Sequence, residues 1–492
     1  MIGAVNPTRM KLSNLLSYPF STLIFILVTF SAFRTKSLGI DQIIFRLIDD
    51  TSKFKVIAFI FSILIIPFFE YYSNNHTVFK FKRKSSRWRV NLVNSSTNRT
   101  VRFMTILAFI NFLTWMNLSP AQSLASNFYS LFRIGTLYPQ FADLRTTLFG
   151  ISCAEVTNIG SYISCGNRGN NWTYPTILLE LRTFSIDPDI SIVIMPLLLF
   201  LISICIFILM KKFPTRYFYF MITFFVLPPF LIAIERGNLD IIIFCLILFI
   251  LLITRNTEIS SSQLILISLA LAIGSFLKFY PIIGLVILLY FTLRNGKQDR
   301  RIASWVVLSV GVITLLILFK DFSGLQNQSV SDLSGSIGLR NLVALTLGLK
   351  DSSGVTPPQL FLCLVLFSLI FYKLLWKTTS IYQDLKLNQR LEVLITSSIA
   401  FLPWLTATNY YYRLILIWPL VYSLIRFHIL NEVGLNALFR LVLFPTVFGF
   451  ALNFRTFALV QNVAISPICL LFIFFVVREI AGIRFFRLTK FR

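Results

Sequence analysis

Residues 235–253 read ERGNLD followed by IIIFCLILFILLI, so a short charged segment leads directly into an uncharged apolar run. Apolar residues also precede this segment, which therefore interrupts two apolar helices with almost no spacer. Apolar stretches near the length needed to cross about 30 Å of hydrocarbon recur from Tyr18 to Val477, and about fourteen can be counted. The sequence predicts an all-α protein, a polytopic transmembrane bundle of about 12–14 helices.

The composition excludes a soluble globular domain, because 56% of the 492 residues are hydrophobic, 52 are Phe and only 13% are charged. The net charge of +25 would also suit a nucleic-acid surface. The basic residues are instead spread among short loops at alternate helix ends, which is the positive-inside pattern of membrane proteins. We therefore expect membrane lipids as partners and no nucleic acid.

The charge pattern also predicts which loops share a membrane face. The basic segment from Lys80 to Arg89 is the strongest cytoplasmic marker, and both termini fall on its side. Five polar elements of mixed charge fall on the other side: the loops near 119–188 and 320–356, the 235–238 turn, the 278–281 turn and residues 409–413. They could line one site, although loops also need polar residues for solvation alone.

No soluble domain boundary is evident, because the polar loops are too short to bury cores of their own. Residues 1–102 form an N-terminal extension of two predicted helices and a basic cytoplasmic loop. Its first apolar run is followed by Arg34 and Lys36 rather than by a small-residue cleavage site, which predicts a retained helix. Residues 103–427 form the predicted core, and 428–492 supply C-terminal helices and a basic tail.

The first long polar loop carries Asp143 and Arg145 at i and i+2. An acid beside a base at a membrane edge is a candidate for chemistry, although a helix cap or a salt bridge also explains the aspartate. Cys153 and Cys165 follow in the same loop, on the face where a disulfide can form. Two reduced thiols are the alternative.

Three further segments offer groups that suit phosphate or sugar oxygens. Arg236 and Asn238 supply donors around a glycine that permits a tight turn. Lys278 breaks an apolar run, which is costly unless it snorkels to the surface or meets an anion. Arg413 can bind a phosphate bidentately, whereas the tyrosines before it suit an interfacial aromatic belt.

A metal or a soluble cofactor has little support in the sequence. The only histidines are His76 and His428, and neither belongs to a cluster of ligand residues. No glycine-rich phosphate loop follows a strand. We therefore expect neither a metal nor a cofactor.

Four short motifs together resemble glycosyltransferase family 87, which belongs to the GT-C superfamily of multi-helix membrane enzymes. In chain order they are Asp143-Leu144-Arg145 with downstream cysteines and Tyr174-Pro175, Arg236-Gly237-Asn238, Lys278-Phe279-Tyr280-Pro281, and Tyr412-Arg413. The resemblance covers roughly Arg102 to Phe427. The sequence departs from the family in its N-terminal extension, and in Asp240, where the family more often has neutral polar groups.

The resemblance implies an inverting hexosyltransferase that moves a hexose, mannose being one candidate, from a polyprenyl-phosphate-sugar to an extracytoplasmic glycan or glycolipid acceptor. Such a lipid donor suits a site on that face, since nucleotide sugars are cytoplasmic. Asp143 would be the general base, although Glu155, Glu235 or Asp240 could displace it. The implied substrate-binding residues are Arg145, Tyr174, Arg236, Asn238, Lys278, Tyr412 and Arg413.

A lipid-linked sugar flippase or transporter without catalytic activity is the alternative, and a non-catalytic scaffold is a third. A transporter should bury ionisable groups near the midplane of several helices. The predicted helix interiors from Leu197 to Met210 and from Ile241 to Ile253 contain none, which favours an enzyme. The absence of a retrieval signal at Phe491-Arg492 favours a bacterial inner membrane, with the site facing the periplasm.

Overall fold

The computed structural model describes the chain in segments, which are residues 141–152, 174–184, 186–210, 221, 224–226, 228–255, 259–294, 301–322, 336–349, 354–372, 375–376, 379–406, 409–427 and 455–490. Apart from Met221, these residues belong to one compact unit, Leu137–Phe213 with Phe224–Arg492. The predicted extension at residues 1–102 lies outside the described residues.

The described segments are helical, which confirms the all-α class. The α-helices before residue 300 are α7 (Ala142–Ser152), α8 (Ser191–Met210), α10 (Pro228–Arg236), α11 (Leu239–Thr254), α12 (Ser261–Leu277) and α13 (Ile282–Arg294). Those after it are α14 (Arg301–Phe322), α15 (Leu339–Thr346), α16 (Pro357–Ile370), α18 (Leu387–Thr406), α19 (Ile417–Arg426) and α21 (Arg455–Lys490).

Short elements join these helices. The 3₁₀ segments are η2 (Thr176–Phe184), η3 (Pro188–Ile190), η4 (Phe224–Val226), η8 (Ser380–Asp384) and η9 (Tyr411–Leu416). Two-residue strands β1 (Ser336–Ile337) and β2 (Asn409–Tyr410) pair antiparallel, with Ser336 opposite Tyr410. This ladder links the segment before α15 to the segment before η9.

Two helices in the described part of the chain are long and apolar enough to cross a membrane, Pro188–Met210 and Ile302–Phe319. A third span is formed if Phe230–Arg236 and Leu239–Thr254 count as one, although the two are bent by 118° at the break. These helices agree with a membrane protein. The count of 12–14 spans stays a prediction.

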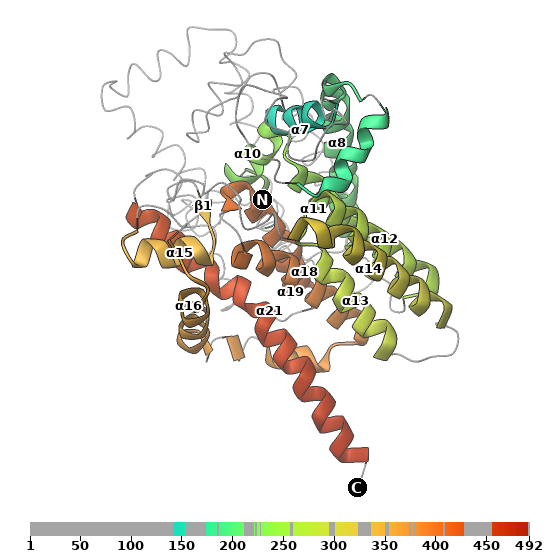
Figure 1. The fold of residues 1–492 in the computed structure, drawn as a ribbon. Coiled ribbons are helices and arrows are strands. Elements are labelled where there is room, and N and C mark those ends of the chain that lie inside the picture. Colours follow the sequence, from blue (N-terminus) through green and yellow to red (C-terminus); the bar gives the residue numbers. More distant parts are fainter. Residues whose placement is uncertain are drawn as a thin grey trace, which may run out of the picture. The chain divides into compact units, whose positions relative to one another are not determined.

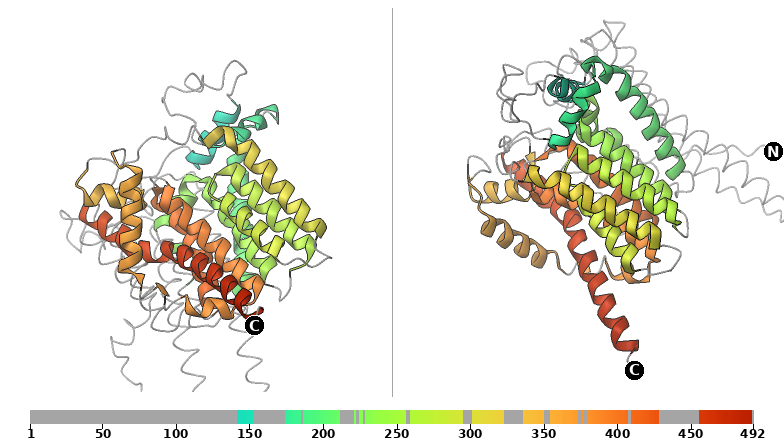
Figure 2. Two further views of the ribbon diagram at one scale, coloured as in Figure 1. Left: turned by 60° about the horizontal axis from the view of Figure 1, so that its bottom comes forward. Right: turned by 45° about the vertical axis from the view of Figure 1, so that its right-hand side comes forward.

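Helix α11 lies inside the bundle, between α8 and α12 and against α18, as Figures 1 and 2 show. Along it, Ile241, Phe244, Leu248 and Leu251 are fully buried or nearly so. On neighbouring faces α14 packs on α12 and α13, while α18 packs on α13, α19 and α21. Because α11 is enclosed, the polar residues at its two ends are held by several other helices.

An aromatic cluster fixes the first turns of α11 against its neighbours. Phe244 makes edge contacts with Phe225, Phe230 and Trp418, at ring-centroid separations of 6.3, 6.1 and 5.9 Å. Such pairs contribute about 0.5–1.5 kcal/mol each beyond the area they bury. The cluster joins η4, α10, α11 and α19 one turn beyond the charged residues at the start of α11.

Candidate active site

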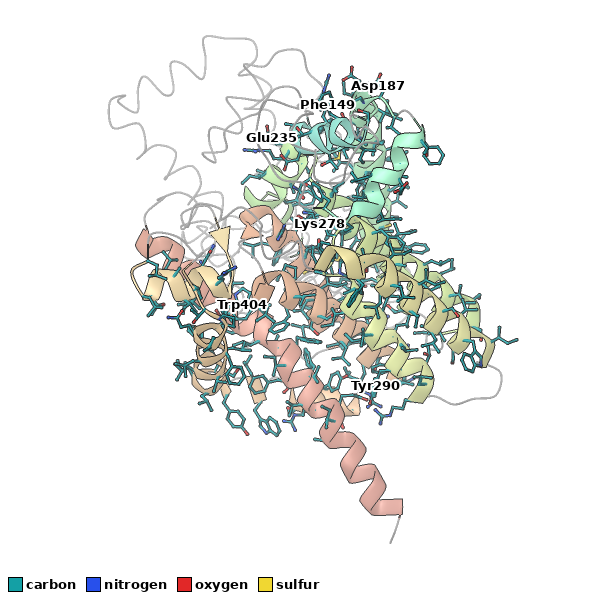
Figure 3. All side chains as sticks on the ribbon, in the orientation of Figure 1. Phe149, Asp187, Glu235, Lys278, Tyr290 and Trp404 are labelled. Atoms are coloured by element: carbon teal, nitrogen blue, oxygen red, sulfur yellow. The ribbon has the colours of Figure 1, made fainter. Side chains whose placement is uncertain are left out.

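Four parts of the chain meet where α11 begins: the start of α7, the α10–α11 turn, the loop between α12 and α13, and η9. Helix α7 packs on α10, and η9 packs on both α10 and α11. Figure 3 shows Glu235 and Lys278 in this region. We call its polar residues the Asp143 cluster, which consists of Asp143, Tyr174, Arg236, Asn238, Asp240, Lys278, Tyr280 and Arg413.

A close backbone approach brings α7 to the α10–α11 turn. Gly237 has φ +62°, and a Cβ atom there would lie 2.7 Å from Cβ of Phe141, too close for any real side chain. Phe141 itself is buried and has φ +56°, a left-handed conformation that costs a non-glycine residue about 1–2 kcal/mol. The glycine in the ERGN segment therefore lets the start of α7, and Asp143 with it, lie against Asn238.

Asn238 caps α11 and contacts Asp143 at the same time. Its Oδ1 accepts the backbone N–H of Asp240 at 3.0 Å and the ammonium of Lys278 at 3.2 Å. Its Nδ2 donates to Oδ2 of Asp143 at 2.9 Å. Since both donors to Asn238 face the carbonyl oxygen, the amide has one orientation that satisfies all of its contacts, and that orientation directs the NH₂ group at Asp143.

Asp240 is fully buried and has a donor on each oxygen. Lys278 donates to Oδ2 at 2.8 Å, and Nε of Arg413 lies 3.5 Å from the same atom. The Tyr280 hydroxyl donates to Oδ1. A carboxylate in the first turn of a helix interacts favourably with the helix dipole, and with both oxygens bonded it is closed to an incoming substrate.

Asp143 has a more open environment, because its side chain is 26% exposed. Oδ2 accepts from Asn238, while Oδ1 has Arg236 as its nearest cation, with Nη1 4.0 Å away. Burial raises the pKa of Asp143 above its usual value, against the lowering effects of the Asn238 hydrogen bond and of Arg236 and Lys278. A carboxylate with an accessible oxygen and a raised pKa is suited to accept a proton.

Tyr174 and Lys278 lie beside these two acids. The ammonium of Lys278 lies 5.8 Å from the centroid of the Tyr174 ring. Burial, with the nearby Asp143 charge, raises the pKa of Tyr174 to about 12, so the hydroxyl stays protonated. Burial also lowers the pKa of Lys278 to about 8, against the opposing effect of Asp240, so the ammonium form still predominates at neutral pH.

The structure brings together five of the residues singled out from the sequence, together with Asp143 itself: Tyr174, Arg236, Asn238, Lys278 and Arg413. Arg145 instead forms an ion pair with Asp189 of η3, at 2.5 Å. Tyr412 lies in η9, but its side chain lies outside the described residues, as do Cys153 and Cys165.

Two members of the cluster were not among the substrate-binding residues expected from sequence, although one of them, Asp240, was considered as an alternative base. Asp240 follows an asparagine cap in the first turn of α11, and that spacing is a common structural signal. Tyr280 belongs to the Lys278-Phe279-Tyr280-Pro281 motif, but its partner Asp240 lies 40 positions earlier in the chain. Glu235, one of the other carboxylates considered, is buried and accepts Nε of Arg236 at 3.1 Å. Glu155 lies outside the described residues.

Within the described segments, no three His, Cys, Asp or Glu side chains are grouped so as to hold a metal ion. Comparisons with models of known protein families, with curated proteins and with solved structures find no match for this chain.

Proposed function

We propose that this protein is an integral-membrane glycosyltransferase that transfers a hexose from a polyprenyl-phosphate-sugar to a glycan or glycolipid acceptor, with inversion and with Asp143 as general base. The observation that carries the proposal is the contrast between two aspartates in one cluster. Asp240 is fully buried and bonded to donors on both oxygens, whereas Asp143 is 26% exposed and holds one oxygen towards Arg236.

In the proposed reaction an acceptor hydroxyl loses its proton to Asp143 as its oxygen attacks the anomeric carbon. The bond between that carbon and the phosphate oxygen breaks, and the polyprenyl phosphate leaves with the electron pair. Arg236 is 32% exposed beside Asp143, and Arg413 is 21% exposed beside Asp240, so both can face the phosphate. Guanidinium groups in a water-poor site stabilise the charge that develops there.

Three further features support the proposal. The apolar helices around the cluster suit an isoprenoid tail, and the loop charges favour a site on the extracytoplasmic face. The order of the four motifs resembles glycosyltransferase family 87, so we propose a GT-C-like bundle. We also propose that the membrane is a bacterial inner membrane, with the site on its periplasmic side.

The test is transfer by the purified protein in lipid, supplied with radiolabelled polyprenyl-phosphate-mannose or -glucose and a membrane-lipid extract. We expect Asp143→Asn to lower the transfer rate by about 10²–10⁴-fold, the usual contribution of a general base, while the protein stays folded. Asp187→Asn is the matched control, because Asp187 is an exposed cap of η3 and asparagine can also cap. Normal transfer by Asp143→Asn would remove Asp143 as the base.

A lipid-linked sugar transporter is the second candidate, and the bent α10–α11 pair favours it. Transporters often bind substrates at a broken helix, and here the 118° break carries charged residues. Donor binding without transfer from either labelled lipid, together with movement of the label across vesicle membranes, would favour this alternative.

A further inference from the structure

The hydrogen bonds of Asn238 form a chain that begins at a buried ion pair and ends at Asp143. Lys278 is buried and donates to both Asp240 and Asn238, at 2.8 and 3.2 Å. Asn238 in turn donates to Asp143. An asparagine amide can be turned by 180° at little steric cost, so its orientation depends on its neighbours. With Lys278 and the Asp240 N–H on its oxygen, only the NH₂ group can face Asp143.

We propose that Asp240 and Lys278 are positioning residues: the ion pair fixes the orientation of the Asn238 amide, and the amide fixes Oδ2 of Asp143. This inference deepens the proposed function and rests on it. It gives Lys278 a different role from the donor contact expected from sequence. The ammonium lies in the interior and is shared between Asp240 and Asn238, so it acts on the base rather than on the phosphate.

The placement of each group explains why the chain contains a lysine at this point. Asp240 is held from three sides, by Lys278, Tyr280 and Arg413, and so it is a fixed anchor for the ammonium. The lysine stem reaches from the end of α12 to the cap of α11, where its ammonium donates to both acceptors. Loss of the ammonium leaves the Asp240 N–H as the one remaining donor to Oδ1, so the Asn238 amide is held less firmly against Asp143.

The chain offers a matched control at the other end of α13. Arg294 donates to the buried carboxylate of Glu479, which also accepts from Tyr382 and Arg390 at 3.1 and 3.2 Å. In Lys278→Met, Asp240 keeps Tyr280 and Arg413 as partners. In Arg294→Met, Glu479 likewise keeps a tyrosine and an arginine, Tyr382 and Arg390. Both variants lose one cation from a buried carboxylate, but only one of them lies next to Asp143.

In the transfer assay we expect Lys278→Met to lower kcat by about ten- to hundredfold, because the base is misplaced, with the donor KM within about threefold of wild type. Arg294→Met should keep kcat within about threefold. A raised donor KM with unchanged kcat in Lys278→Met would overturn the inference and make Lys278 a donor contact. An equal loss of kcat in Arg294→Met would overturn the positioning role, because it would show that losing any cation from a buried carboxylate lowers kcat through stability.

The acidic limb of the pH profile supplies a second readout. The groups that face Asp143 are Arg236 on α10, Asn238 at the cap of α11, Asp240 on α11, Lys278 after α12, and Tyr174 before η2. Removal of Lys278 takes away a nearby cation and the fixed Asn238 donor, so the limb should move to higher pH. An unmoved limb would contradict the chain of contacts.

A measurement without activity separates this inference from the proposed function. Thermal unfolding midpoints in detergent should be non-additive for Asp143→Asn with Lys278→Met, the double variant losing less than the sum of the single losses. An Asn238→Leu background should abolish that coupling, and Asp143→Asn with Arg294→Met should be additive. Additive losses for Asp143 and Lys278 would overturn the positioning role even in a protein that transfers sugar; coupling without transfer would leave it intact and reject the proposed function.

Discussion

The carboxylates at the two ends of α11 differ in how completely their oxygens are hydrogen-bonded. At the Thr254 end, Glu392 is fully buried and accepts from Thr254, Ser423 and Arg426 at 2.7, 2.9 and 2.8 Å. At the Asp240 end, one carboxylate is bonded on both oxygens while Asp143, a neighbour in space, remains partly open. A carboxylate with donors on both oxygens links the helices that supply those donors. A carboxylate with an accessible oxygen can still accept a hydrogen bond or a proton from a substrate.

Another carboxylate with donors on both oxygens lies near the end of α13. Glu479 of α21 accepts from Arg294, Tyr382 and Arg390, and Tyr290 lies within 3.5 Å. Figure 3 shows Lys278, just before α13, well separated from Tyr290, near the far end of α13. The Asp143 cluster and Glu479 therefore lie at opposite ends of this helix. We therefore regard Glu392 and Glu479 as structural acids and Asp143 as the functional one.

Arg426→Met is expected to destabilise the Thr254 end of α11 without affecting the Asp143 cluster. Glu392 would remain buried with two hydroxyl donors and no cation, which costs about 3–5 kcal/mol of unfolding free energy. Denaturation in detergent measures this loss, and transfer per folded molecule should not change. The double variant Glu392→Gln with Arg426→Met removes both charges and should recover part of the stability. A loss of transfer without a loss of stability would make the two ends functionally alike.

Gly237→Ala is expected to lower both stability and transfer by disturbing the Asp240 end of α11. The left-handed φ of +62° and the 2.7 Å approach to Phe141 should cost about 2 kcal/mol and push α7 away from Asn238, so transfer falls as well. Gly311→Ala in α14 is the matched control, because its Cβ would meet nothing within 4 Å. There we expect a gain of about 0.5–1 kcal/mol. Equal effects of the two substitutions would mean that the close approach does not matter.

Arg236→Gln tests whether the exposed guanidinium beside Asp143 binds the donor phosphate. We expect the donor KM to rise about tenfold, with a smaller change in kcat, because a guanidinium near the phosphate is lost. Arg255→Gln serves as the control at the other end of α11, where Arg255 donates to the Ile208 carbonyl. Steady-state kinetics with varied donor separates the two constants. An unchanged KM in Arg236→Gln would exclude Arg236 from the donor site.

The smallest expected effect is a pH dependence of stability that belongs to Asp143. Its pKa is raised in the folded state, so folding favours the protonated form. This contribution is complete below the unfolded pKa and is lost as the pH rises through the folded pKa. Thermal midpoints of wild type should therefore decline across that interval more than those of Asp143→Asn. Parallel curves would show that burial does not perturb Asp143.

Much of the local structure follows from the sequence. The apolar run at 241–253 predicted a helix without ionisable residues, and it forms most of α11. The glycine in ERGN predicted a tight turn, and Gly237 makes one. Both features depend on neighbouring residues only, through the length of the apolar run and the left-handed conformation that glycine adopts readily.

The sequence alone predicted an all-helical class, which the described residues confirm, and a membrane protein, with which two long apolar helices agree, because composition and the length of the apolar runs decide these features. Which aspartate has both oxygens bonded and which has one accessible oxygen depends on how the helices pack. Asp143 receives its donor from 95 positions away, Asp240 receives Lys278 from 38 positions away, and Arg145 pairs with Asp189. Such partners are chosen when distant helix ends pack together, and no pattern local to either aspartate encodes that choice.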